Sequence, residues 1–204
     1  MHFLNLENIN KSADGVEYHP LRPFLPEGTK VLFLGSFPPP RNRWCIDFFY
    51  PNFINDHWRI EGQVFFGDKE HFVDAAHKTF RLPEIVQFLT EKGIGFFDTA
   101  TAVRRLKENA SDKDLEMVEK TDLAALLSQI PYCQHIVCTG QKSFSAITED
   151  FGVAVPAMGE HHTFSIADRT LQLWRMPSSS RAYPMKLCDK AAYYQRMMRQ
   201  IGLL

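Results

Sequence analysis

The sequence predicts an α/β fold in which helices cover both faces of a largely parallel β-sheet. Short apolar runs alternate along the chain with longer segments whose apolar residues recur at helical spacing. Such runs are typical of strands buried on both faces, and their alternation with helices is typical of parallel sheets. The expected strands cover residues 31–34, 94–98, 134–140 and 170–176.

Helical patterns fill most of the intervening chain. Apolar residues at i, i+3, i+4 and i+8 mark residues 67–80, while Pro83 suits the first turn of the next helix and Gly93 its end. The expected helices are one that starts within residues 52–60, with Trp58 on its buried side, and then residues 67–80, 83–92, 122–129, 141–151 and 187–201. The expected irregular segments are an extended lead-in over residues 1–29 and a charged surface loop over residues 107–120.

Composition limits the class of protein. A chain of 204 residues with 45% hydrophobic and 13% aromatic residues fits a single domain spanning residues 1–204 with a large core. No apolar run approaches the length of a membrane span, and polar residues break up the start where a signal peptide would need an apolar stretch. The four cysteines form no C-x-x-C pair, which argues against zinc, iron–sulfur and disulfide sites. We therefore expect a cytoplasmic protein without a bound metal.

Charge is unevenly distributed along the chain. Residues 169–204 hold seven basic residues and one acidic residue, a net charge of +6, which leaves −7 for residues 1–168 because the whole chain carries −1. A basic end on a nearly neutral protein is typical of a surface that faces phosphate. A solvated helix face explains the same charges equally well.

Three strand ends are expected to meet at one edge of the sheet. Residues 35–38 follow the first strand, residues 98–99 end the second and residues 177–181 follow the last. Ligands of open α/β sheets bind at this edge, although residues 35–38 can also be only a rigid, proline-bearing exit from a core strand. The serine-rich loop at 177–181 offers backbone N–H groups, hydroxyls and an arginine, which can hold a phosphate or stabilise a departing anion.

Other catalytic patterns are absent from the sequence. No G-x-S-x-G elbow surrounds the serines, and neither a G-x-x-x-x-G-K-[ST] nor a G-x-G-x-x-G phosphate loop occurs. His161 and His162 are adjacent and therefore a poor chelating pair, so we expect loop residues there, with substrate contact as the alternative. Residues 41–51 mix basic and aromatic side chains, which suits stacking and phosphate contact but also suits a core under a loop.

Five short motifs, in order, resemble the uracil-DNA glycosylase superfamily. The segment at 176–181, Met-Pro-Ser-Ser-Ser-Arg, resembles the second active-site motif of its thymine-DNA and mismatch-specific uracil-DNA glycosylase branch, and residues 189–194 resemble the segment after that motif in the same branch. Residues 34–38, Leu-Gly-Ser-Phe-Pro, are similar to the first motif, closest to the form in the hypoxanthine-DNA glycosylase branch. Residues 50–58 and 139–144 are similar to the H-P-x-N-x-F-W and L-G-K-x-A-Y segments.

This resemblance implies a three-layer α/β/α sandwich with a short, mostly parallel central sheet. It also implies a monofunctional enzyme that flips a deaminated base, uracil or hypoxanthine, out of DNA and hydrolyses its N-glycosidic bond in base excision repair. Flipping costs a few kcal/mol and least at a mismatch, which favours deaminated bases. The implied partner is single- or double-stranded DNA that contains such a base, bound by a monomer without metal or cofactor.

The first motif departs from the family pattern. Phe37 stands where most branches place the Asn or Asp that positions water, and a phenyl ring can stack on a base but cannot orient water. In the hypoxanthine branch a later asparagine takes this role, and it maps to Asn55. The alternative for Asn55 is a structural asparagine that fixes the loop after Pro51.

Asp98 is the second catalytic candidate. It stands in a segment similar to the one in which the main uracil-DNA glycosylases read uracil with an amide. An ionised carboxylate can accept a base N–H and a protonated one can donate to a base carbonyl, so Asp98 can read the base or activate water. The alternative is that Asp98 only caps the following turn.

The predicted site combines these matches. The catalytic candidates are Asn55 and Asp98, and the expected base-binding residues are Gly35, Ser36, Phe37, Pro38, Phe49 and Tyr50. The expected DNA-binding residues are Lys142, Pro177, Ser178, Ser179, Ser180, Arg181, Ala182 and Tyr183, the last two near the gap left by the flipped base. The alternative function is a catalytically silent member of the superfamily that acts as a DNA-binding module.

Overall fold

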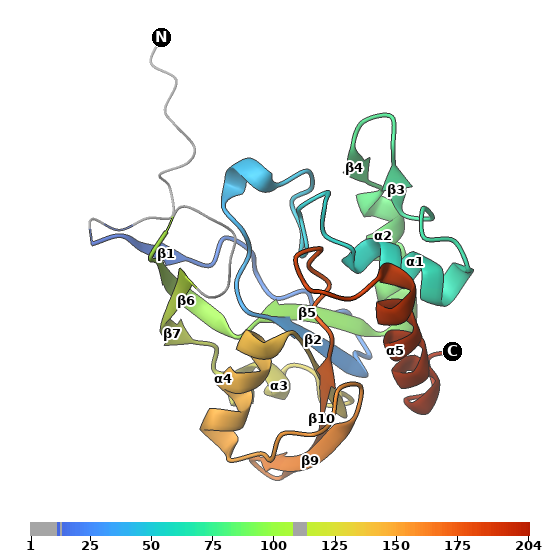
Figure 1. The fold of residues 1–204 in the computed structure, drawn as a ribbon. Helices are drawn as coiled ribbons and strands as arrows, with labels where there is room; N and C mark the ends of the chain where they lie inside the picture. The colour runs from blue at the N-terminus through green and yellow to red at the C-terminus, as the bar shows by residue number, and fades with distance from the viewer. Residues whose placement is uncertain (1–11, 13, 108–113) are drawn as a thin grey trace.

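A central five-stranded sheet organises the computed structural model, which describes residue 12 and residues 14–107 and 114–204. The strand order is β5-β2-β8-β10-β9, with four parallel strands and β9 antiparallel at the edge (Figure 1). The strands are β2 (Val31–Gly35), β5 (Ile94–Asp98), β8 (His135–Thr139), β9 (His161–Ile166) and β10 (Arg169–Met176). The four strands expected from the apolar runs are confirmed, and the fold is mixed α/β with a mostly parallel sheet.

Strand register places the carboxyl ends of four strands at one edge of this sheet. Gly35 pairs with Asp98 of β5, Leu34 pairs with Cys138 of β8, and Met176 of β10 pairs with Thr139. All residues of β2 and β5 are buried, as the uninterrupted apolar runs predict. The carboxyl ends of the parallel strands therefore lie side by side and hold their following loops together.

Five helices accompany the sheet in the described part of the chain. They are α1 (His57–Phe66), α2 (Leu82–Lys92), α3 (Leu123–Ser128), α4 (Gln141–Phe151) and α5 (Leu187–Gln200). Helix α4 contacts β8, β2 and β9, helix α2 contacts β5, and helices α1 and α5 pack on each other. The last four confirm the sequence predictions to within a residue at each end, and no described helix combines the length and apolar character that crossing a bilayer requires.

Helix α1 starts within residues 52–60, as the sequence predicts, but in the second half of that range. Asn52 Oδ1 accepts a hydrogen bond from the Ile54 N–H at 3.1 Å, and Asn55 Oδ1 accepts one from the His57 N–H at 2.9 Å. Asparagine side chains that bond the backbone in this way compete with helix formation. The helix therefore begins at His57, with Trp58 fully buried as expected.

The prediction of a helix at residues 67–80 is wrong. Gly67, with φ of 70°, ends α1, and a short antiparallel hairpin follows, with strands β3 (Val73–Asp74) and β4 (Thr79–Phe80). Its turn passes through Lys78 at φ of 51°. In this hairpin, the spacing of the buried aromatic residues along the sequence matches that of a helix only by coincidence.

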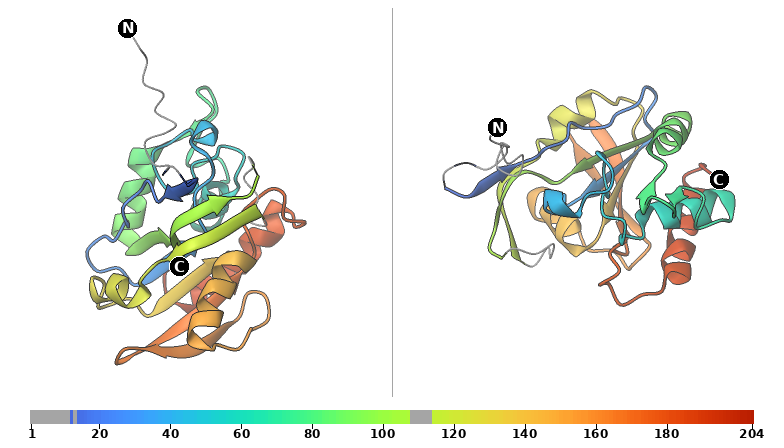
Figure 2. Two further views of the ribbon diagram at one scale, coloured as in Figure 1. Left: turned by 90° about the vertical axis from the view of Figure 1, so that its left-hand side faces the viewer. Right: turned by 90° about the horizontal axis from the view of Figure 1, so that it is seen from above.

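The lead-in and the charged loop contribute a second sheet. Strand β6 (Ala100–Arg105) pairs antiparallel with β1 (Val16–Tyr18) and with β7 (Leu115–Lys120). Figures 1 and 2 show this sheet on the opposite side of the molecule from α1 and α5. The prediction of a loop at 107–120 is thus wrong for β7, whereas β1 lies within the lead-in expected at 1–29 and is itself extended. Residues 1–11, 13 and 108–113 lie outside the described chain.

The expectation that His161 and His162 lie in a loop is also wrong. Both belong to β9, where His161 pairs with Trp174 and His162 with Leu173 of β10. The His161 ring packs on the Trp174 ring with centroids 4.3 Å apart. Polar and apolar residues alternate along β9 because only one face of this edge strand is covered.

Candidate active site

A cavity of about 950 Å³ opens where the carboxyl ends of β2, β5 and β8 meet the loop after β10. Its lining includes 15 of the 16 residues selected from the sequence: Gly35, Ser36, Phe37, Pro38, Phe49, Tyr50, Asn55, Asp98, Lys142, Ser178, Ser179, Ser180, Arg181, Ala182 and Tyr183. The exception is Pro177, which is buried and whose carbonyl accepts a hydrogen bond from the Tyr194 hydroxyl at 2.9 Å. Nearly all the residues selected from the sequence therefore lie around one cavity.

Asp98 and Gly35 form one wall of the cavity. Any Cβ added at Gly35 would collide with Asp98 Oδ1, so glycine is needed for the carboxyl group to lie across the end of β2. The Asp98 side chain is 9% exposed. The turn after Asp98 is held by groups other than its carboxyl group. The Thr99 N–H donates to the Gly35 carbonyl at 2.9 Å, and Thr121 Oγ1 donates to the Asp98 backbone carbonyl at 2.7 Å.

His19 is a site residue that sequence reasoning missed. Its Nε2 lies 2.8 Å from Asp98 Oδ2, and its side chain is 4% exposed. The ring touches Phe97 and Phe37, with centroids 4.8 Å and 5.2 Å away. A histidine 79 positions before its partner, in a proline-bearing segment with no periodicity, carries no sequence signal for this contact.

Aromatic side chains line the same cavity. Phe37 is half-buried and packs on the small cluster of Ala100, Val103 and Leu115, beside the Arg105 guanidinium. Phe49 is 4% exposed and belongs mainly to the core. The cavity thus has one half-exposed phenyl ring on the side of the second sheet.

Tyr50 is held in a constrained conformation. Its backbone has φ of 48°, its ring stacks on His57 at a centroid distance of 3.8 Å, and its hydroxyl is hydrogen-bonded to Thr139 Oγ1. A left-handed conformation is uncommon for a tyrosine and persists only where surrounding contacts fix it. These contacts make the Tyr50 ring a rigid part of the wall.

Asn55 lines the cavity from the segment that leads into α1. Its Oδ1 already accepts the His57 N–H at the start of that helix. The carbonyl oxygen of the side chain thus has a structural task, which is the alternative that the sequence left open.

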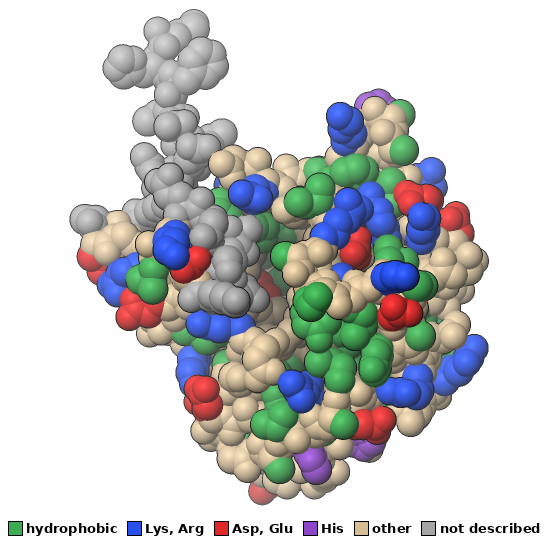
Figure 3. Space-filling model, in the orientation of Figure 1, with side chains coloured by type: hydrophobic (Ala, Val, Ile, Leu, Met, Phe, Trp, Pro, Cys, Tyr) green, Lys and Arg blue, Asp and Glu red, His purple; other side chains and the backbone are tan. Residues whose placement is uncertain are grey.

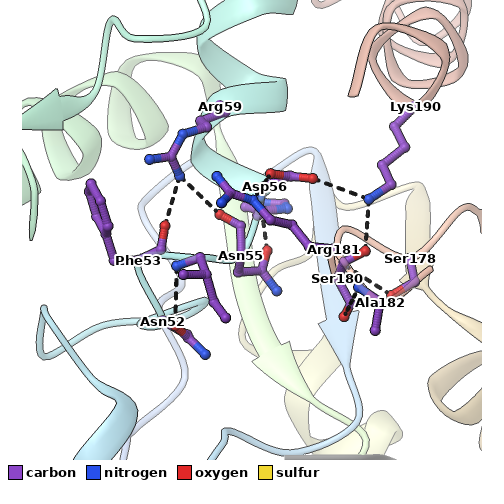
Figure 4. Close-up of polar contacts among 12 residues, drawn as sticks. Asn52, Phe53, Asn55, Asp56, Arg59, Ser178, Ser180, Arg181, Ala182 and Lys190 are labelled. Atoms are coloured by element: carbon purple, nitrogen blue, oxygen red, sulfur yellow. Dashed lines mark hydrogen bonds and ion pairs between the residues drawn. The ribbon is translucent and has the colours of Figure 1, made fainter. Parts of the chain in front are cut away.

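The serine loop is braced by its own hydroxyls. Ser178 Oγ accepts the Ser180 N–H and Ser180 Oγ accepts the Ala182 N–H, each at 3.2 Å (Figure 4). These two N–H groups are thereby engaged within the loop. The hydroxyl–backbone bonds fix the shape of the loop beside the cavity.

A buried ionic network ties the serine loop to the start of α1. Asp56 Oδ1 accepts from Arg181 Nε at 2.9 Å, and Asp56 Oδ2 lies 3.3 Å from Lys190 Nζ, which also donates to the Ser180 carbonyl at 2.7 Å (Figure 4). The Asp56 N–H donates to the Ser179 carbonyl at 3.0 Å. Lys190 is fully buried and Arg181 is half-exposed, so only Arg181 presents charge to solvent.

Lys142 has a structural contact in addition to its place in the lining. Its ammonium donates to the Leu115 carbonyl at 2.6 Å, which connects α4 to β7. Among the described residues, no group of three or more His, Cys, Asp or Glu side chains is placed to hold a metal ion.

Two ionisable side chains are buried behind the Tyr50 ring without hydrogen-bond partners among the described residues. His57 and Glu61 are 0% and 1% exposed, and His57 Nε2 lies 3.9 Å from Glu61 Oε1. Burial lowers the pKa of His57 to about 3 and raises the pKa of Glu61 to about 8, because both charged forms lose their hydration. Both side chains are therefore neutral at pH 7.

Comparison with known proteins gives a match to solved structures. Neither a protein-family model nor a curated protein matches this sequence. Among solved structures, the solution NMR structure of a "putative Uracil DNA glycosylase" from Methanosarcina acetivorans matches with a TM-score of 0.59 and 20% identity, over 92% of this chain and 99% of that chain. The two chains share a fold.

A match over nearly the full length of both chains means that the central sheet and its flanking helices follow one arrangement. At 20% identity this likeness concerns the fold alone, so the chemistry must be argued from the side chains that this chain places around the cavity.

Proposed function

We propose that this protein is a monofunctional DNA glycosylase of the uracil-DNA glycosylase superfamily, with the three-layer α/β/α arrangement of that fold. The observation that carries the proposal is the Asp98 carboxyl group, nearly buried at the wall of a cavity that aromatic side chains and the serine loop also line. A carboxylate with restricted access to water, beside a pocket large enough for one base, suits a reaction that moves a proton within a closed site. The substrate is a deaminated base in DNA, uracil or hypoxanthine.

The proposed chemistry uses one water molecule. The water oxygen forms a bond to C1′ of the flipped nucleotide while the bond from C1′ to the base nitrogen breaks. The electron pair of the broken bond leaves with the base as an anion, and Asp98 accepts the proton that the water loses. Donors around Ser36 and Ser178 stabilise the departing anion, and Phe37 with Tyr50 or Phe49 stacks on the base.

Asp98 is a better candidate than Asn55 for the catalytic role. The Asn55 carbonyl oxygen accepts the first free N–H of α1, whereas one oxygen of Asp98 lies against Gly35 on the cavity wall. Asn55 then keeps the segment before α1 in place. Arg181, Lys142 and the serine loop contact the phosphates, which positions DNA without reading its sequence.

Cleavage of lesion-bearing oligonucleotides tests the function. Duplex and single-stranded substrates with uracil, hypoxanthine, xanthine or a thymine mismatch are incubated with excess protein and treated with alkali. We expect strand breaks at uracil or hypoxanthine and none at undamaged bases. Salt-dependent DNA binding without any cleavage would instead establish the silent DNA-binding module.

Two variants test the assignment of the catalyst. Asp98→Asn keeps the shape of the side chain but removes the proton acceptor, so we expect the single-turnover rate to fall by about 100-fold or more. Asn55→Ala is expected to retain a rate within about 10-fold of the wild type while lowering stability by about 1 kcal/mol through the lost hydrogen bond to the His57 N–H. The reverse order of rates would assign the water to Asn55.

A further inference from the structure

We infer that His19 is a positioning residue that orients the Asp98 carboxyl group and keeps it hydrogen-bonded while it gains a proton. This inference rests on the proposed glycosylase function. It adds to the site a side chain from before the first strand of the central sheet, whose ring lies behind Asp98.

The backbone fixes where the His19 ring lies. The His19 N–H donates to the Thr101 carbonyl at 2.8 Å, directly after β1 pairs with β6. Strand β6 itself follows β5 after one residue, so the segment that carries His19 is anchored to the chain that carries Asp98. The second sheet therefore acts as the support for this pair.

The ring nitrogens have partners on both sides. Nε2 lies 2.8 Å from Asp98 Oδ2, while Nδ1 lies 2.9 Å from the Leu21 carbonyl oxygen and 3.2 Å from the Leu21 amide nitrogen. The Leu21 peptide thus offers both an acceptor and a donor to Nδ1. Consequently, Nδ1 keeps a hydrogen bond whether or not it carries a proton.

This arrangement tolerates a change in the protonation of Asp98. With Asp98 ionised, Nε2–H donates to Oδ2 and Nδ1 accepts from the Leu21 N–H. When Oδ1 takes the proton that the attacking water loses, Oδ2 becomes the carbonyl oxygen of the neutral acid and still accepts from Nε2–H. The hydrogen bond between His19 and Asp98 is then kept before and after proton transfer.

Aromatic rings surround His19, so a water molecule cannot readily take its place beside Asp98. The rings of Phe97, Phe37 and Phe49 lie 4.8, 5.2 and 6.3 Å from the His19 ring, and its side chain is only 4% exposed. A carboxyl oxygen that loses its partner in such surroundings is left unsatisfied or turns away. Because Oδ2 is held by His19, Oδ1 stays against Gly35 on the cavity wall.

A pair of substitutions separates the two sides of the ring. In His19→Gln the amide nitrogen takes the approximate place of Nε2 and can still donate to Asp98. In His19→Asn the amide nitrogen takes the place of Nδ1, so it reaches Leu21 but not Asp98. We expect single-turnover cleavage to fall by less than about 10-fold for Gln and by about 100-fold for Asn, with the Kd for DNA unchanged in both.

Two controls guard against a merely structural effect. His77 forms a comparable pair with Asp74, with Nδ1 and Oδ2 2.7 Å apart, but its side chain is 78% exposed and does not line the cavity, so His77→Asn is expected to leave the rate unchanged. In an Asp98→Asn background, His19→Asn is expected to slow cleavage by less than about 3-fold, because residues that act as a unit are not additive. Circular dichroism and thermal unfolding check that each variant folds.

The outcomes separate this inference from the proposed function. Wild-type protein that cleaves no lesion refutes both. Cleavage by the wild type, with His19→Gln and His19→Asn impaired equally or with fully additive effects in the Asp98→Asn background, refutes the role of His19 alone. A loss of DNA affinity without a loss of rate refutes it as well.

Discussion

Gly35 is the residue whose lack of a side chain most directly shapes the site. A methyl group there would collide with Asp98 Oδ1, and the carboxyl group cannot move freely because His19 holds its other oxygen, Oδ2. Gly35→Ala is therefore expected to slow single-turnover cleavage by about 10- to 100-fold, since small displacements of reacting groups have effects of that size. The overpacked wall should also lower the free energy of unfolding by about 1–3 kcal/mol.

Gly152 provides the matched control for this substitution. It ends α4 at φ of 62°, and a Cβ added there meets nothing within 4 Å. Gly152→Ala is expected to cost about 1 kcal/mol of stability through backbone strain and to leave the cleavage rate unchanged. A Gly35→Ala variant that lost only stability, as Gly152→Ala should, would contradict the role assigned to the glycine.

At the residue scale, the sequence predicts positions near strand ends much better than partners from distant segments. Asp98 follows an unmistakable apolar run, and Gly35 ends another, so both could be placed at the edge of a parallel sheet. His19 could not, because its contact with Asp98 depends on β1 pairing with β6. Likewise, the structural role of Asn55 depends on one contact with the backbone, the hydrogen bond from the His57 N–H to its side chain.

Two buried side chains of helix α1, Glu61 and His57, make the stability of the protein depend on pH. The pKa of Glu61 is about 8 in the folded protein against 4.5 when exposed, so the folded state holds an extra proton and stability falls as pH rises from 4.5 to 8. The pKa of His57 is about 3 against 6.5, so stability falls as pH decreases from 6.5 to 3. The two slopes oppose each other between pH 4.5 and 6.5.

A net loss of unfolding free energy should therefore appear only below pH 4.5 or above pH 6.5. Between pH 6.5 and 8 we expect the wild type to lose about 1 kcal/mol of unfolding free energy per pH unit. Glu61→Gln, a neutral isostere of the protonated side chain, should remove this alkaline loss, as urea titrations at several pH values would measure. Glu84→Gln, at a 52% exposed side chain, is the control and should leave the slope as in the wild type.

The junction of α1, α5 and the serine loop depends on a buried ionic network. Asp56→Asn removes the carboxylate that faces the fully buried Lys190 ammonium and should cost about 3–5 kcal/mol. Arg181→Ala removes a half-exposed partner and should cost about 1 kcal/mol or less. Denaturant unfolding measures both, and the double variant Asp56→Asn/Lys190→Met should regain part of the stability; no recovery would mean that Lys190 is not the group left uncompensated.

At the element scale, the sequence predicted the central strands and four helices, and it failed where one pattern admits two structures. The apolar spacing of Phe72, Ala75, Ala76 and Phe80 fits a helix, but Gly67 and the turn at Lys78 fold this segment into a hairpin. Strand β7 is mostly exposed and charged, so its period-2 alternation is weak. Pairing with β6, rather than local preference, makes it a strand.

Across the whole molecule, the basic carboxyl-terminal region turns out to be largely structural. Lys190 is buried against Asp56, Arg169 donates to the carbonyls of Leu127 and Ile130, and Arg175 donates to the Pro156 carbonyl. Net charge along the sequence was therefore a poor guide to the surface that we propose for DNA binding. Of the seven basic residues in this region, Arg181 alone lines the cavity, and the other cations of its lining are Arg43, Arg105 and Lys142.

Arg43 offers the clearest test of this surface. It is exposed on the short 3-10 helix over Arg41–Arg43 and lines the cavity. Figure 3 shows several Lys and Arg side chains on this face, interspersed with apolar ones. Removing one phosphate contact should lower the slope of log Kd against log salt concentration by about 1 and weaken binding equally for all DNA sequences. Arg199→Ala, in the last turn of α5 and outside the cavity lining, is the matched control. Equal slopes for the wild type and Arg43→Ala, measured by fluorescence anisotropy over a range of salt concentrations, would place the DNA elsewhere on the protein.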